Sequence, residues 1–70
     1  MTDSVYKVVE VVGTSPESWE KAAATAVEVA AHTLEDLRVA EVETLDMHIE
    51  GKKITYRAKL KLSFKYHEHE

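Results

Sequence analysis

The chain has 70 residues, a mass of 7.9 kDa and no cysteine, so it forms one small domain at most and has no disulfide or thiolate metal site to stabilise it. A domain of this size buries only about 60% of the surface that its unfolded chain exposes. The free energy gained by burying apolar surface then roughly equals the conformational entropy cost of ordering the chain. We therefore expect a stable fold only in an oligomer or with a bound ligand.

The composition is typical of a folded globular chain, with 44% hydrophobic and 31% charged residues. A net charge of −4 gives no general attraction to nucleic acids or anionic membranes, so we expect neither as a partner. Uncharged stretches such as Ala22–Val27 are far shorter than the ~18 apolar residues of a membrane span. Met1–Tyr6 also lacks the features of a signal peptide, which predicts a cytoplasmic location.

The first half of the chain predicts a strand followed by a helix. Val5–Val12 is rich in β-branched residues, and Gly13 predicts a turn after this strand. Thr14–Glu17 offers a capping side chain, a proline suited to the first helical position and an acid for the first turn. We therefore expect a helix that begins near Pro16.

This helix is predicted to be amphipathic, with an apolar stripe of small residues. The stripe recurs at a spacing of three to four residues and comprises Trp19, Ala23, Ala26, Ala30, Thr33 and Leu37. Alanine has a small side chain, so we expect the helix to lie close against a sheet, with Trp19 in the core.

The second half predicts two long strands joined by a tight turn. Val39–Ile49 is β-branched but changes its phase of alternation, which indicates a bulge or bend. Glu50–Lys53 contains a glycine and predicts the turn of a hairpin. Apolar and polar residues then alternate over Ile54–His67. At ~3.3 Å per residue this strand spans roughly 40 Å, longer than the helix can cover, so a partner subunit should cover the rest.

No residue pattern indicates catalysis. The sequence has no Gly-x-Ser-x-Gly elbow, phosphate-binding loop or His-Glu-x-x-His helix, and we predict that the protein is not an enzyme. Glu28, His32 and Asp36 are spaced to share one helix face and could hold a divalent cation, although we favour an ordinary solvated face. His67–Glu70 is a weak transition-metal signature at the end of the chain.

Two groups of charged residues on the predicted strands are candidates for ligand binding. Glu41, Glu43 and Asp46 supply the carboxylate oxygens that calcium prefers, but one chain has too few for its 6–8 ligands, so copies of the chain would have to share a site. The basic row of Arg57, Lys59, Lys61 and Lys65 could attract a phosphate group, coenzyme A or another nucleotide included. We favour pairing of this row with the acids across strands.

The motifs together resemble those of the dodecin family over nearly the full chain. The resemblance rests on Val5–Val8, on Gly13–Pro16 with Ser18–Glu20, on Ala40–Val42, and on Thr55–Lys59 with Leu62–Lys65. It implies an α+β protomer formed by residues 1–70 as a single domain, with the element order β-α-β-β. A three-stranded antiparallel sheet would wrap around one helix, and the protomers would assemble as a hollow homododecamer.

The resemblance also implies a ligand, because most dodecins bind and store flavin without using it catalytically. Val39 stands where the family has a flavin-stacking tryptophan, Leu45 where it often has a glutamine, and Arg57 at a position that faces the flavin ring. By analogy with base stacking, the loss of the tryptophan weakens binding roughly 5- to 150-fold. Arg38–Ala40 resembles a branch of the family without this tryptophan, which includes a calcium-binding member.

Three hypotheses follow for the function. We prefer a non-catalytic, dodecin-like assembly that binds or stores a small ligand, with calcium as the first choice. The second hypothesis is binding and storage of riboflavin or FMN with reduced affinity. The third is a structural or partner-binding shell without a small ligand.

Overall fold

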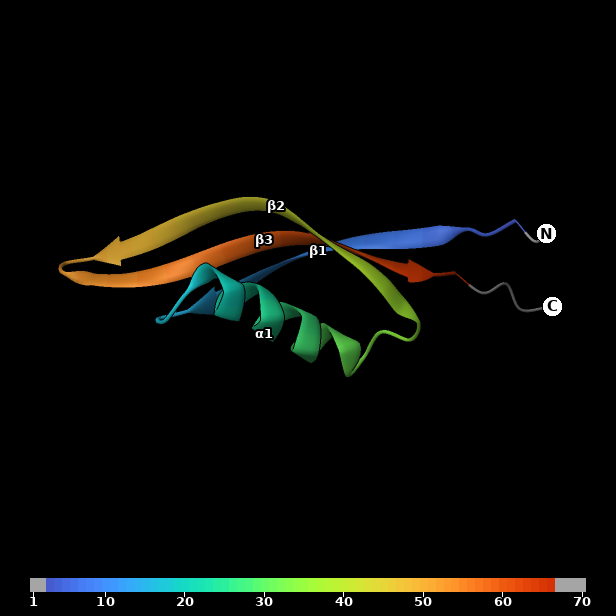
Figure 1. Ribbon diagram of the computed structural model, residues 1–70, viewed down its shortest axis with the longest axis horizontal. Helices are drawn as coiled ribbons and strands as arrows, with labels where there is room; N and C mark the ends of the chain where they lie inside the picture. The colour runs from blue at the N-terminus through green and yellow to red at the C-terminus, as the bar shows by residue number, and fades with distance from the viewer. Residues whose placement is uncertain (1–2, 67–70) are drawn as a thin grey trace.

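The computed structural model describes residues 3–66 as one helix and one three-stranded sheet. The elements are β1 (Tyr6–Ser15), α1 (Trp19–Ala31), β2 (Leu37–Glu50) and β3 (Lys53–Lys65). Both β1 and β2 pair with β3 in antiparallel fashion, in the order β1-β3-β2. The helix lies against one face of the sheet (Figure 1). The predicted α+β fold with the order β-α-β-β is confirmed.

The central strand β3 carries most of the core, as its alternation predicts. Ala58, Leu60 and Leu62 are buried, and Arg57 and Lys59, which precede Ala58 and Leu60, are exposed. Successive side chains of a strand point to opposite faces, so the apolar set of β3 faces α1. These three side chains form one cluster with two alanines of the helix, Ala22 and Ala26.

The helix begins later than predicted, because a different residue caps it. Ser18 adopts an extended conformation, and its side chain accepts a hydrogen bond from the Lys21 amide at 3.0 Å. This bond satisfies one of the free amides of the first turn. The Ser15 hydroxyl instead accepts from the Glu17 amide in the preceding turn, so the prediction of a helix beginning near Pro16 is wrong.

The helix also ends earlier than the predicted stripe. It stops at Ala31, and Leu37 begins β2, where it pairs with Phe64. Thr33 and Leu37 are therefore not on the helix, and pairing with β3 determines the conformation of the chain there. The most buried helical residues are Ala22 and Ala26, and Trp19 is only half-buried.

Gly13 lies inside β1 rather than in a turn. It is buried and pairs with Ala58, and β1 continues to Ser15. A side chain here would overlap the Ala22 carbonyl oxygen and would reach within 2.8 Å of the Ala26 Cβ. Glycine is therefore needed because the helix backbone lies directly over this position, and the expectation of a turn is wrong.

The predicted irregularity of β2 is confirmed, and it changes which residues of β2 lie on each face of the sheet. The register with β3 shifts between Leu37 and Val39 and again between Val42 and Thr44. Val42 pairs with the buried Leu60, and Leu45 pairs with Ala58. Residues paired across strands share a face. Because of the second shift, Val42 before it and Leu45 after it both lie on the face of the sheet that the helix packs on.

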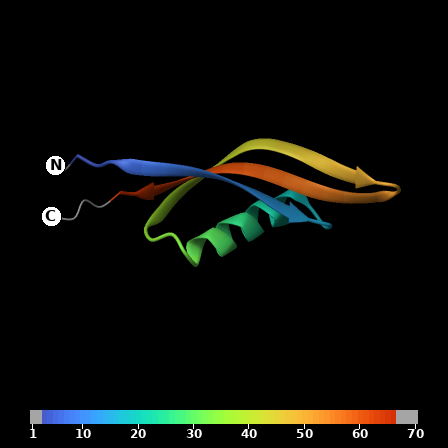
Figure 2. The same ribbon diagram turned by 180° about the vertical axis from the view of Figure 1, so that it is seen from behind.

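The hairpin of β2 and β3 extends well past the helix (Figure 2). Gly51 has a φ of +62° in the predicted turn. At ~1.5 Å per residue, the 13 residues of α1 span roughly 20 Å, whereas the molecule is 54 Å long. Several large apolar side chains are left exposed on β2 and at the turn, namely Val42, Leu45, Met47, Ile49 and Ile54.

We predict that Gly13→Ala destabilises the fold more than Gly51→Ala. The first substitution pushes a methyl group into the Ala22 carbonyl. Overpacked cores lose ~1–3 kcal/mol of the free energy of unfolding, and we expect a loss at or above the upper end of this range. The second meets no atom within 4 Å and carries only the ~1–2 kcal/mol of a positive φ. Denaturant unfolding of both variants measures this order, and equal losses would contradict the close packing of α1.

Candidate functional site

The face of the sheet opposite the helix, here called the outer face, carries charged side chains of β2 and β3. On β3 it comprises Thr55, Arg57, Lys59, Lys61, Ser63 and Lys65, which alternate with the buried residues. Their partners on β2 are Val39, Glu41, Thr44, Asp46 and His48. The basic row therefore lies between two other strands, and its charges meet the side chains of both.

Three basic side chains of the row are paired with acids from the neighbouring strands. The Arg57 Nε lies 2.8 Å from an Asp46 carboxylate oxygen, and the Lys61 Nζ lies 3.5 Å from a Glu43 oxygen. Both pairs cross from β3 to β2, as the cross-strand prediction requires. The third pair runs the other way, from Lys59 to Glu10 on β1 at 3.8 Å.

The pair of Asp46 and Arg57 has the most defined geometry of the three. The Arg57 Nε and Nη2 donate to the two carboxylate oxygens of Asp46 at 2.8 and 3.1 Å. This hydrogen bonding lowers the pKa of Asp46 and raises that of Arg57. The indole of Trp19 donates to the Asp46 carbonyl at 3.0 Å and packs edge-on against Tyr56. Asp46 is thus held through both its side chain and its backbone.

The acids predicted to bind metal do not form a metal site within one chain. Asp46 is bound by Arg57, and Glu43 contacts Lys61. Glu41 is exposed, and no salt bridge of its side chain is found within residues 3–66. Across that same range, no three His, Cys, Asp or Glu side chains lie close enough together to hold an ion. A calcium site with these residues would need more than one copy of the chain.

The three predicted pocket residues are also separated. Val39 pairs with Ser63 on the outer face, whereas Leu45 lies on the helix side of the sheet. Arg57 shares the outer face with Val39 but lies six residues from Ser63 along β3, which is roughly 20 Å. One subunit therefore cannot bring these side chains together around one flavin.

The predicted face of Glu28, His32 and Asp36 does not exist. His32 is the C-cap of α1, and Asp36 lies beyond the helix with a φ of 58°. Because the helix ends at Ala31, these three residues do not continue its periodic spacing. The metal signature at His67–Glu70 lies outside the described residues.

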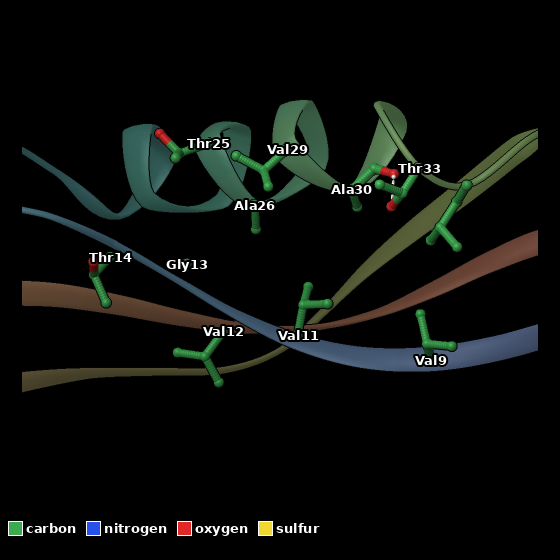
Figure 3. A pocket seen from close by; sticks show the side chains of 11 residues that line it. Val9, Val11, Val12, Gly13, Thr14, Thr25, Ala26, Val29, Ala30 and Thr33 are labelled. Carbon is green, nitrogen blue, oxygen red and sulfur yellow. Dashed lines mark hydrogen bonds between the residues drawn. The ribbon is translucent and has the colours of Figure 1, made fainter.

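Two grooves flank the helix, and both are mainly apolar. The larger has a volume of about 540 Å³ and lies between α1 and β1, where Val11 and Ala26 point toward each other (Figure 3). The smaller has about 290 Å³ and is lined by Trp19, Glu20, Ala23, Val42 and Leu45. Glu20 is the one carboxylate among the residues that line these grooves, too few for the 6–8 oxygen ligands of calcium, so we place the polar chemistry on the outer face.

Comparison with known proteins identifies the family. The family model described as Dodecin matches residues 5–67. The chain belongs to the dodecin family. It is 56% identical over 63 residues to the calcium dodecin of Mycobacterium tuberculosis, a match that covers 89% of each chain.

Solved dodecin structures share the fold of this dodecin. The crystal structure of the M. tuberculosis calcium dodecin, described as calcium chelating with a novel calcium-binding site, matches with a TM-score of 0.85 and 51% identity. That match covers 96% of this chain and 97% of the other. The dodecin of Streptomyces coelicolor matches with a TM-score of 0.90 and 37% identity, over 99% and 100% of the two chains.

The pairing partners of the basic row could not all be predicted from the sequence. Glu10 was not singled out, because its contact with Lys59 depends on the register between β1 and β3. The bond from Trp19 to the Asp46 backbone joins residues 27 positions apart. Nothing in the local sequence around Trp19 indicates this partner.

We predict that the pair of Asp46 and Arg57 makes stability sensitive to acid. The pKa of Asp46 lies below its ordinary value of 3.8 in the folded state, so its stabilisation is complete above that value and is lost as the pH falls through the folded pKa. Asp46→Asn should melt lower than the natural protein at neutral pH, and the difference should shrink in acid. Melting temperatures across this pH range test the pair, and a difference that stays constant would contradict it.

Proposed function

We propose that this dodecin assembles as a hollow homododecamer, binds calcium at sites shared between subunits, and has no catalytic activity. Its 56% identity to a calcium dodecin is the observation that carries the proposal. The exposed acids of β2 and the replacement of the flavin-stacking tryptophan by Val39 support it. We expect the assembly to work in the cytoplasm. No helix within residues 3–66 is long and apolar enough to cross a membrane.

The surface of the chain supports assembly. The chain exposes 5567 Å², whereas a compact monomer of 7.9 kDa exposes about 4,400 Å² by size scaling. The excess exceeds the ~800 Å² that each partner buries in a stable protein interface. The apolar groove between α1 and β1 and the exposed apolar residues of the hairpin provide suitable contact surfaces.

The calcium proposal rests on Glu41 and Glu43. Glu41 is exposed on a strand at the free edge of the sheet, so copies of the chain can bring several Glu41 carboxylates together. Glu43 is held only by a 3.5 Å contact with Lys61, and exposed pairs of this kind contribute little energy. We leave Asp46 out of the proposed ligand set, because Arg57 occupies both of its carboxylate oxygens.

Flavin binding with reduced affinity is the second candidate. Val39 and Glu41 share the outer face and are two residues apart. At this place the chain offers a branched aliphatic side chain and a carboxylate instead of an aromatic ring. The site therefore favours a hard cation over a stacked flavin. The remaining candidate, a shell without a ligand, predicts that neither calcium nor riboflavin changes the melting temperature.

We predict that calcium raises the melting temperature of the assembly and that a chelator reverses the rise. Glu41→Gln should weaken calcium binding by at least about tenfold, because each copy in a shared site loses one anionic oxygen ligand. Glu35→Gln changes the charge equally in the segment before β2 and should leave binding unchanged. Calorimetry with calcium measures both variants.

The contrary outcomes of this titration are equally specific. Absence of calcium heat, together with unchanged melting in chelator, would remove the calcium proposal. Quenching of riboflavin at low micromolar concentration would favour the flavin candidate instead. Equal weakening by Glu41→Gln and Glu35→Gln would show that calcium responds to the overall charge of the shell and not to a site.

A further inference from the structure

Acids on the neighbouring strands pair with three of the four cations in the basic row of β3. Arg57, Lys59 and Lys61 each contact an acid on β1 or β2. A row of this kind would otherwise attract phosphate groups, because arginine and lysine bind them through charge-assisted hydrogen bonds. The acids therefore decide whether the row acts as an anion site.

Arg57 is the member of the row best suited to phosphate and is also the most completely occupied. A guanidinium presents its donors in a planar fork that fits a carboxylate or a phosphate in the same bidentate way. Asp46 already fills this fork, since the Arg57 Nε and Nη2 donate to its two oxygens. An incoming phosphate must displace this carboxylate and then lie beside its negative charge.

The backbone of Asp46 is also held from the helix side of the sheet. Trp19 donates to the Asp46 carbonyl and packs against Tyr56 with ring centres 5.0 Å apart. Tyr56 directly precedes Arg57 on β3. The first turn of the helix therefore contacts both strands of the pair, β2 at the Asp46 backbone and β3 at the residue before Arg57.

We propose that Asp46 is a specificity-determining residue, which prevents Arg57 from binding phosphate-bearing ligands by occupying its hydrogen-bond donors. Arg57 then binds nucleotide phosphates and pyrophosphate only weakly, and the proposed calcium ligands Glu41 and Glu43 lie elsewhere on the same strand as Asp46. The inference goes beyond the proposed function and does not depend on it, because it concerns the binding of anions and not of calcium.

The test is a calorimetric titration of the intact assembly with inorganic pyrophosphate. Asp46→Asn removes the charge but keeps the shape of the side chain, and it should raise pyrophosphate affinity at least about tenfold over the natural protein. Asp46→Glu keeps the charge and should retain the natural weak binding. Glu50→Gln is the matched control, because Glu50 lies on the same strand and face but pairs in register with Lys53.

Each outcome of this titration decides the proposal. Tighter binding by Asp46→Asn alone supports it, whereas equal gains in Asp46→Asn and Glu50→Gln would show a general charge effect and overturn it. Tight binding by the natural protein would also overturn it. If Asp46→Asn fails to assemble, Arg57→Gln gives the second test: Asp46 already fills the Arg57 fork, so this variant should keep the weak pyrophosphate affinity of the natural protein, and a clear loss of affinity would overturn the proposal.

A calcium titration of the same proteins, in separate samples without pyrophosphate, separates this inference from the proposed function. If the natural protein fails to bind calcium, the proposed function falls, and the pyrophosphate comparison still judges Asp46. If calcium binds but Asp46→Asn gains no affinity for pyrophosphate, only the role of Asp46 is overturned.

Discussion

A short helix that covers only part of a long sheet is the constraint on which the rest of the structure depends. The five buried apolar side chains, three of them alanines, lie where α1 crosses the middle of the sheet. Gly13 lets the helix backbone approach closely enough to bury these small side chains. Beyond this contact the hairpin leaves large apolar residues exposed, and their burial requires other surfaces, which identical subunits can supply.

The sequence predicted the elements of this fold better than their boundaries. The alternation along β3 and the phase change of β2 were clear, because burial of one face leaves a periodic pattern. The ends of α1 depend on which residue caps the helix and on where pairing with β3 begins, and the apolar pattern indicates neither. Ser18 caps the helix in place of the earlier residues, and pairing of Leu37 with Phe64 draws the chain into β2. Gly13 misled the prediction because a glycine in a strand resembles a turn signal.

The residue types of the candidate site were predictable, but their pairing was not. The sequence places acids and bases on the same strands, and the resemblance to dodecins indicates Val39 and Arg57 as ligand positions. Which acid meets which base depends on strand register and on the bulges of β2. Asp46 is paired with Arg57, whereas Glu41 is exposed, and for this reason we propose Glu41 and not Asp46 as a ligand of a shared cation.

Native mass spectrometry of protein purified without added ligand tests the central claim most directly, because one spectrum reports both the subunit number and the retained mass. The account predicts a homododecamer with cation-sized adducts that a calcium chelator removes. A monomer or dimer would contradict the argument that other subunits must cover the exposed hairpin. A homododecamer that retains flavin would contradict the preference for calcium, because it would show that Val39 does not abolish the flavin pocket.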